Sequence, residues 1–322
     1  MIRIEYVYWL TGALFGVWAL LGLRDATNPK RWANALFYGL LAVSFLFGSY
    51  LGNLANGLLV VALALIAGFV GLGRGREDTT SAEQRAENAR RHGDWLFLPA
   101  LVISAVAIVC ALVLKDLPVG GQPLIEAAKA TVVSLAIGVV VATLIAVLWL
   151  RPRPSVPLQE GRRLIDTIGW AAILPQALAS LGAVFLLTGV GEQVGGLMTA
   201  WLPLGAPFAA VAAYTVGMAL FTIIMGNAFA AFPIMTAAIG LPLIVKTFHG
   251  DPVIMGAIGM LSGFCGTLMT PMAANFNVVP ATLLELPDRN AALNGVIRAQ
   301  IPTASALLLA NTLLMYFLVF RF

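Results

Sequence analysis

Charged side chains are scarce in this sequence of 322 residues. Only 11% of its residues are Asp, Glu, Lys or Arg, whereas 60% are hydrophobic. A soluble domain carries about 25% charged residues, so this chain has too few to cover a surface that faces water. The composition predicts an integral membrane protein with the lipid bilayer as its surroundings. In such a protein the net charge of +4 reports topology and does not indicate binding to nucleic acid.

Cysteine and histidine are almost absent. Cys110 and Cys265 lie in apolar stretches, so no disulfide framework is expected. His92 and His249 lie in expected loops and have no metal-ligand spacing around them. These residues therefore predict neither a cofactor site nor a metal centre.

Ionisable residues are missing from most of the second half. Between Thr167 and Val245 only Glu192 is charged, and no residue between Pro252 and Leu284 is charged. A relay of protons through buried carboxylates is therefore disfavoured. We also expect no enzyme here, because a membrane-embedded enzyme would need a nucleophile–base pair or a carboxylate cluster.

Long apolar runs take the place of these residues. A helix needs about 20 apolar residues to cross the hydrocarbon core of a bilayer. Regular runs of that length occupy 5–23, 32–50, 54–73, 95–114 and 130–150. The whole chain predicts an all-α polytopic membrane protein with roughly eight to ten membrane segments.

The connections between these runs differ in charge. Most basic residues lie in 24–31, 74–94 and 151–163, whereas the intervening connections carry only Lys115 and Lys129. The positive-inside rule then places those three loops in the cytoplasm and the N-terminus outside. The first apolar run has no basic segment before it and no small-residue cleavage site, so it predicts a retained helix and not a signal peptide.

The segment RPRPSVPLQEGRR (151–163) is rich in proline and arginine, which is typical of an extended connector. It separates a scaffold-like bundle, 1–150, from a less regular half, 164–322. The charged stretch 75–94 mixes both signs and fits either a solvated linker or a short surface helix.

The second half begins with an interrupted segment, 164–191, which has Pro175-Gln176 and Ser180 near its centre. A single kinked helix fits this pattern. A re-entrant hairpin that turns at Pro175-Gln176 fits it as well, provided that protein or a water-filled cavity surrounds the non-helical backbone. Both interpretations stay open, and the hairpin is the working expectation.

The next apolar segment, 204–246, is interrupted at Gly226-Asn227 and at Pro233. One uninterrupted helix of roughly 42 residues would be about 63 Å long, which is twice the hydrocarbon thickness. The segment must therefore bend, break or cross the membrane twice. We expect a broken helix.

A third irregular segment, 252–280, precedes a last helix at 301–320. It holds small and polar residues in an apolar frame: Gly263, Gly266, Thr267, Thr270, Pro271, Asn275 and Asn277. Carbonyl groups freed at a helix break can coordinate a cation, and helix N-termini can hold a carboxylate. Any one such residue is as readily a packing point between helices, but three interruptions in one half favour a transporter site near the bilayer midplane.

The stretches IIMGNAFAAFPIM (223–235) and GFCGTLMTPMAANFNVVPATLLEL (263–286) resemble a bacterial membrane family long catalogued as a domain of unknown function. Its members are identified as the larger subunit of a two-subunit 5-oxoproline (pyroglutamate) transporter. The family in turn resembles one half of the ion-transporter superfamily, which includes sodium-coupled dicarboxylate carriers. The resemblance implies half of an inverted-repeat, elevator-like carrier in the bacterial inner membrane, working by alternating access.

Within this resemblance, Asn227 matches the central asparagine of a Ser-Asn-Thr motif. Gly226 and Ala228 stand where the family pattern has hydroxyl residues, so a sodium ion would rely on backbone carbonyls and the amide. Thr270-Pro271 matches the start of a second motif. Only one such set is found, which implies that a smaller membrane subunit supplies the other repeat. A dimer of heterodimers is one assembly open to such a pair.

The expected site follows from these matches. Gln176 and Ser180 would hydrogen-bond substrate, Asn227 would orient substrate or ion, and the remaining expected substrate-binding residues are Thr267, Thr270, Asn275 and Asn277. The expected cation-binding or backbone-shaping residues are Gly226, Asn227, Ala228, Gly266 and Pro271. Sodium is the candidate coupling ion, and a proton stays open. The alternatives are an accessory subunit of another transporter, or a carrier of a different organic acid such as a dicarboxylate.

Overall fold

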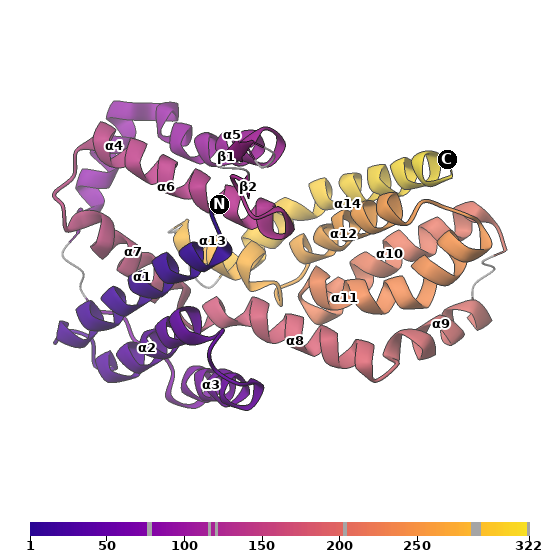
Figure 1. The fold of residues 1–322 in the computed structure, drawn as a ribbon, viewed down its shortest axis with the longest axis horizontal. Coiled ribbons are helices and arrows are strands. Elements are labelled where there is room, and N and C mark those ends of the chain that lie inside the picture. Colours follow the sequence, from indigo (N-terminus) through magenta and orange to yellow (C-terminus); the bar gives the residue numbers. More distant parts are fainter. Residues whose placement is uncertain (76–78, 115–116, 120–121, 202–204, 285–290, 321–322) are drawn as a thin grey trace. The chain divides into compact units, whose positions relative to one another are not determined.

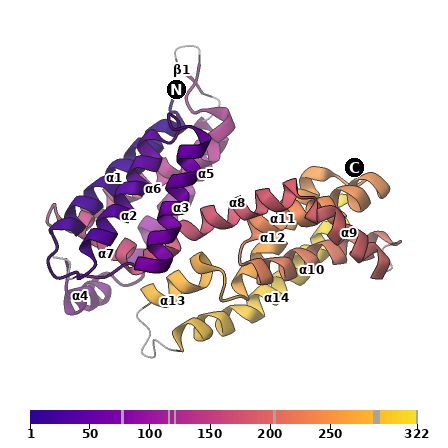
Figure 2. The same cartoon turned by 90° about the horizontal axis from the view of Figure 1, so that it is seen from below.

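The computed structural model describes residues 1–75, 79–114, 117–119, 122–201, 205–284 and 291–320. The chain divides into two compact units, Met1–Gly169 and Trp170–Phe322. In the described part the fold is helical, apart from a short antiparallel ribbon in which β1 (Pro118–Val119) pairs with β2 (Gln122–Pro123). Figures 1 and 2 show the elements of each unit.

The first unit contains the expected regular helices. They are α1 (Ile4–Arg24), α2 (Arg31–Phe47), α3 (Asn53–Leu65) with a π-helical end (Ile66–Val70), α4 (Ala82–His92), a 3₁₀ turn (Gly93–Phe97), α5 (Leu98–Leu112), a second 3₁₀ turn (Ala127–Lys129), α6 (Ala130–Leu150) and α7 (Val156–Ile168). Helix α1 packs against α2, and α5 packs against α6. The five helices predicted in residues 1–150 are present within a few residues of their expected bounds.

Helix α4 settles the open interpretation of residues 75–94. Ser81 caps the helix by accepting from the backbone N–H of Gln84, whose side chain accepts from Ser81 N in return. This reciprocal capping box satisfies two N–H groups that the first turn would otherwise leave without partners. Ala82–His92 therefore form a short polar helix.

The connector expected at 151–163 is only partly extended, because α7 starts at Val156. Pro157 lies in the first turn of α7, where a missing N–H is tolerated. Helix α7 is fastened to α1 by an ion pair between buried Arg162 and Asp25, with Arg162 Nη2 2.8 Å from Asp25 Oδ2. Residues 156–168 therefore belong to the first unit.

The second unit begins with a 3₁₀ turn (Gly169–Ile173) at the boundary. It continues with α8 (Leu174–Leu187), α9 (Val190–Trp201), α10 (Pro207–Met225), α11 (Ala228–Met235), a long π-helix (Thr236–Thr247), α12 (Pro252–Leu268), a π-helical turn (Ala274–Val278), α13 (Val279–Leu283) and α14 (Ala292–Val319). Its core lies between α10, α12, α14 and the long π-helix, around Tyr214, Met218 and Met255. Figure 2 shows these helices gathered into one bundle.

The turn expected at Pro175-Gln176 is not there, because α8 is helical from Leu174 onward. The chain bends instead at Gly189, whose φ is 69°. Gly182 of α8 lies against Ala230, and Gly195 of α9 lies against Ala238, so both helices run in the same sense along α11 and its π-helical extension (Figure 1). Residues 164–191 are therefore not one continuous helix, and the chain does not reverse at Pro175-Gln176.

The interruption at Gly226-Asn227 is present, but it reverses the chain. Tyr214, in the first half of α10, forms a hydrogen bond of 3.1 Å with Thr236, which directly follows α11. Because these two residues lie far from the joint on either side of it, α10 and α11 are antiparallel neighbours. Each is long and apolar enough, with the π-helical extension of α11, to cross a membrane. The segment expected as one broken helix is thus two adjacent helices.

Two prolines fail to break their helices. Pro233 lies inside α11, which continues and then widens into the π-helix at Thr236. Pro302 lies inside α14, which starts at Ala292 and not at the expected residue 301. Membrane helices tolerate proline because neighbouring helices and local π-helical turns satisfy the backbone groups that the proline leaves without a partner.

Seven helices in the described residues are long and apolar enough to cross a membrane, and two shorter apolar helices, α2 and α12, accompany them. Most large hydrophobic side chains on their outer faces are exposed, as expected where lipid replaces water. The protein is a multi-pass membrane protein.

Candidate binding site at the helix ends of the second unit

The turn between α10 and α11 is built by two residues with different tasks. Gly226 ends α10 with a left-handed backbone, φ 75°, which glycine adopts without steric penalty. Asn227 begins α11 as its N-cap: its Oδ1 accepts from the backbone N–H of Phe229 at 2.8 Å. The side chain of Asn227 is buried, with 8% exposed. In the described part of the chain, nothing accepts a hydrogen bond from its Nδ2.

The end of α12 lies against this turn. A Cβ added to Gly226 would meet Met272 within 3 Å, so the two backbones are in close contact. The hydroxyl of Thr270 donates to the carbonyl of Ile223, in the last turn of α10, at 2.8 Å. Two interruptions that are far apart in the sequence are thereby joined into one site.

Asn277 holds the loop after α12 in place. It is fully buried, and its Nδ2 donates to the carbonyls of Thr267 at 2.8 Å and Thr270 at 2.7 Å. Because both partners accept, the amide must face them with its nitrogen. Its Oδ1 is buried and has no hydrogen-bond partner in the described structure. A buried oxygen that accepts no hydrogen bond favours a bound donor or cation.

Two glycines of α12 allow the helices to approach. A side chain at Gly263 would collide with Met218 and Ala228, and one at Gly266 would collide with the backbone of Ala219. Close contacts between small residues are typical of membrane helix pairs. Gly266 and Ala228 therefore shape the site through packing.

Both threonine hydroxyls have acceptors within the chain. Thr267 donates its proton to the carbonyl of Phe264 at 2.6 Å, and Thr270 donates to Ile223. A hydroxyl has one proton to donate, so neither threonine is free to donate to a carboxylate in this structure. Asn227 Nδ2 is the side-chain donor that the turn leaves available.

The remaining residues predicted for the site are either exposed or have side chains outside the described residues. The side chains of Gln176 and Asn275 lie outside the described residues, although their backbones belong to α8 and to the π-helical turn. Ser180 is exposed on α8, two residues before the contact between Gly182 and α11. Pro271 is exposed in the loop after α12.

Sequence reasoning missed two polar side chains near the site. Thr222 is fully buried one turn before Gly226, and its hydroxyl has no partner in the described structure. Gln300 of α14 donates to the carbonyl of Phe276 at 3.3 Å, which leaves its buried Oε1 without a partner. The signal for Thr222 was its place four residues before Gly226 on one helix face. Gln300 could be placed here only once α14 was known to start before residue 301.

The groups at this site are neutral. The described residues contain no cluster of His, Cys, Asp or Glu that could hold a metal ion. A cation here would depend on neutral oxygens, of which Asn277 Oδ1 and Thr222 Oγ1 are buried and unpartnered. An anion would depend on Asn227 Nδ2 and on the N-terminus of α11.

Residues 5–320 match the sequence pattern of a family described as "Protein of unknown function (DUF979)". The chain belongs to this family. No curated protein and no solved structure matches it. The match to DUF979 spans both units and therefore includes the whole site at the helix ends.

Proposed function

We propose that the protein is a subunit of a secondary active transporter for a small organic carboxylate, with 5-oxoproline as the expected substrate. The observation that carries this proposal is the uncharged site where the end of α10, the start of α11 and the end of α12 meet. Thr270 and Ile223 join these elements by a hydrogen bond. A helix N-terminus such as that of α11 is a ready-made site for a small anion.

The chemistry of the site suits a carboxylate and a small cation. The N-terminus of α11 carries partial positive charge, and Asn227 Nδ2 adds a donor beside it. The unpartnered oxygens of Asn277 and Thr222 suit a hard cation such as sodium, which we propose as the coupling ion. No carboxylate or histidine is needed for either task.

One such site lies in the described residues, and we propose that a smaller membrane subunit supplies the matching repeat. The pair would work by alternating access in the bacterial inner membrane, in the elevator-like manner that the family resemblance implies. The first unit would then be the scaffold. A dimer of such pairs is compatible with this arrangement.

A second candidate, an accessory subunit that lines no transport pathway, is favoured by one observation. The donors of Thr267, Thr270 and Asn277 are all satisfied within the chain, as they would be in a purely structural joint. The two candidates differ in what they expect of Asn227.

Uptake of radiolabelled 5-oxoproline into proteoliposomes tests the proposal, using this chain with its partner subunit and with each chain alone. Asn227→Asp keeps the capping oxygen and removes the Nδ2 donor, so α11 stays capped. We expect uptake to fall at least about tenfold, since a hydrogen bond to a charged group contributes about 1.5–3 kcal/mol. The unfolding temperature should stay within about 2 °C of the native value.

Asn53→Ala is the matched control, because Asn53 is an exposed asparagine in the first turn of α3. It should leave uptake unchanged. Normal uptake by a well-folded Asn227→Asp complex would overturn the carboxylate site and favour the accessory subunit. Dicarboxylate uptake in place of 5-oxoproline would keep the site and change the substrate, and a sodium gradient added or withheld identifies the coupling ion.

A further inference from the structure

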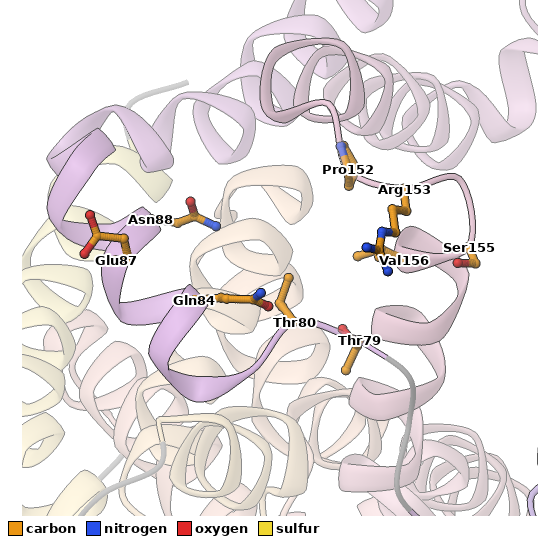
Figure 3. A pocket seen from close by; sticks show the side chains of 9 residues that line it. All are labelled: Thr79, Thr80, Gln84, Glu87, Asn88, Pro152, Arg153, Ser155 and Val156. Carbon is orange, nitrogen blue, oxygen red and sulfur yellow. The ribbon is translucent and has the colours of Figure 1, made fainter.

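A polar cavity in the first unit lies far along the chain from the helix-end site. It has a volume of about 510 Å³ and lies between residues 79–88, which include the first half of α4, and residues 152–156, which lead into α7. Figure 3 shows the side chains that line it. All of them belong to the unit Met1–Gly169, so the cavity does not depend on how the two units are arranged.

Two side-chain amides and one guanidinium supply the nitrogen donors of this cavity. Gln84 and Asn88 are one turn apart on α4, and both amides point toward Arg153 on the opposite wall (Figure 3). Glu87 also lines the cavity, and its carboxylate lies on the side away from Arg153 (Figure 3). Gln84 Oε1 is held by the backbone N–H of Ser81, which leaves its Nε2 to face outward. In the described part of the chain, Arg153 forms no ion pair.

The nearby carboxylate of Glu160 is already occupied. It accepts hydrogen bonds from Thr79 and Thr80 and pairs with Arg163 at 2.7 Å. Burial by itself raises the pKa of Glu160, but the hydrogen bonds from Thr79, Arg163 and Thr80 outweigh it, and the pKa is lowered. Of the charged side chains that line the cavity, Arg153 faces the two amides and Glu87 lies away from them, so the space between Arg153 and the amides favours an anion.

The cavity lies beside the end of a membrane-spanning helix. His92, the last residue of α4, makes an edge contact with Trp149, with ring centroids 5.1 Å apart. Trp149 is the penultimate residue of α6, and tryptophan near the end of a span is typical of the headgroup level. Further basic side chains lie on α4 and directly after α6, namely Arg85, Arg90, Arg91 and Arg151.

We propose that this cavity binds a phosphate group, supplied by the headgroup of an anionic phospholipid. Arg153 binds the phosphate oxygens through its fork of N–H groups, and the amides of Gln84 and Asn88 donate from the facing wall. A basic pocket at headgroup level is the arrangement by which membrane proteins hold anionic lipids. A free phosphate compound offers the same chemistry, and the test below separates the two sources.

The test uses the full chain, stripped of lipid in an uncharged detergent, and measures binding of three probes by isothermal titration. They are dihexanoyl phosphatidylglycerol, dihexanoylglycerol, which lacks the phosphate, and inorganic phosphate. Arg153→Gln and Arg151→Gln remove one charge each from neighbouring exposed arginines, of which only Arg153 lines the cavity. Asn88→Asp is a second cavity variant on the exposed face of α4.

We expect phosphatidylglycerol to bind and dihexanoylglycerol not to bind. The affinity for phosphatidylglycerol should fall roughly tenfold in Arg153→Gln and in Asn88→Asp, and less than about twofold in Arg151→Gln. Binding of inorganic phosphate alone, with the same dependence on Arg153, assigns the site to a soluble phosphate compound and keeps the phosphate chemistry. Equal losses in the two arginine variants, or equal binding of dihexanoylglycerol, would overturn the proposal.

Discussion

Asn277 joins the end of α12 to the turn that follows it through two hydrogen bonds from one nitrogen. Asn277→Ala leaves the buried carbonyls of Thr267 and Thr270 without this donor. Each unsatisfied group costs about 1–3 kcal/mol, so for the two carbonyls we expect a loss of about 2–6 kcal/mol in the free energy of unfolding. Thermal unfolding in detergent would show it as a fall of several degrees.

Asn294→Ala serves as the control for this prediction, because Asn294 is exposed in the first turn of α14. Its unfolding temperature should match that of the native chain. An unchanged unfolding temperature in Asn277→Ala would mean that water replaces the amide at both carbonyls. In that case Asn277 would matter through its unpartnered oxygen alone.

Asp25 gives the first unit a dependence on pH. Burial by itself raises the pKa of Asp25, but hydrogen bonds from Thr27 and the charge of Arg162 lower it below its ordinary value of 3.8. A lowered pKa contributes stability above the unfolded pKa, and this stability is lost as the pH falls through the folded pKa. Asp25→Asn should therefore lower stability at pH 7, by about 1–3 kcal/mol, and the difference from the native chain should shrink below pH 3.8.

Unfolding temperatures measured from pH 7 down to pH 3 check this prediction. Asp94→Asn, at an exposed position, is the control and should show little difference at either end of the range. If the unfolding temperatures of Asp25→Asn and of the native chain differed by the same amount at every pH, the contact with Arg162 would not depend on the charge of Asp25.

At the scale of the element, the joint between α10 and α11 depends on the backbone of Gly226. An alanine there must adopt φ 75°, and its Cβ would lie 2.7 Å from the Cβ of Met272. The left-handed conformation alone costs an alanine about 1–2 kcal/mol, and the collision adds to it. We expect Gly226→Ala to lower the unfolding temperature by several degrees. Gly295→Ala is the control, since a Cβ there meets nothing within 4 Å; an equal effect of both substitutions would contradict the close contact.

The same joint shows what the sequence could and could not predict. Continuous apolar runs predicted the helices of the first unit, because length and hydrophobicity alone identify a span. Pro175 misled, since a proline suits the first turn of a helix as well as a loop, and the bend lies at Gly189 instead. Asn227 was expected at an interruption. The contact between this interruption and the end of α12, however, is made by the carbonyl of Ile223 and the backbone of Met272. Backbone groups carry no residue identity, so sequence alone could not pair them.

At the scale of the whole molecule, each unit has polar contacts of its own inside an apolar frame. In the first unit, Asn34 and Tyr38 of α2 donate to buried Asp166 of α7 at 3.0 and 2.7 Å. In the second, Thr215 and Thr312 bond between α10 and α14 at 2.8 Å. Hydrogen bonds of this kind fix helix neighbours where lipid offers no hydrophobic drive for association. These bonds therefore fix the neighbouring helices within each unit.

The last prediction concerns which side of the membrane each loop faces. The basic loops predict a cytoplasmic α4 and an external connection between α5 and α6. A chain with Cys110→Ala and Cys265→Ala can carry a single new cysteine, either by Glu83→Cys on α4 or by Lys129→Cys before α6; both positions are exposed. A membrane-impermeant maleimide should label the Lys129→Cys chain in intact cells and the Glu83→Cys chain only after permeabilisation. Labelling of the Glu83→Cys chain in intact cells would reverse the orientation, and the cavity of Arg153 would then face the outer leaflet.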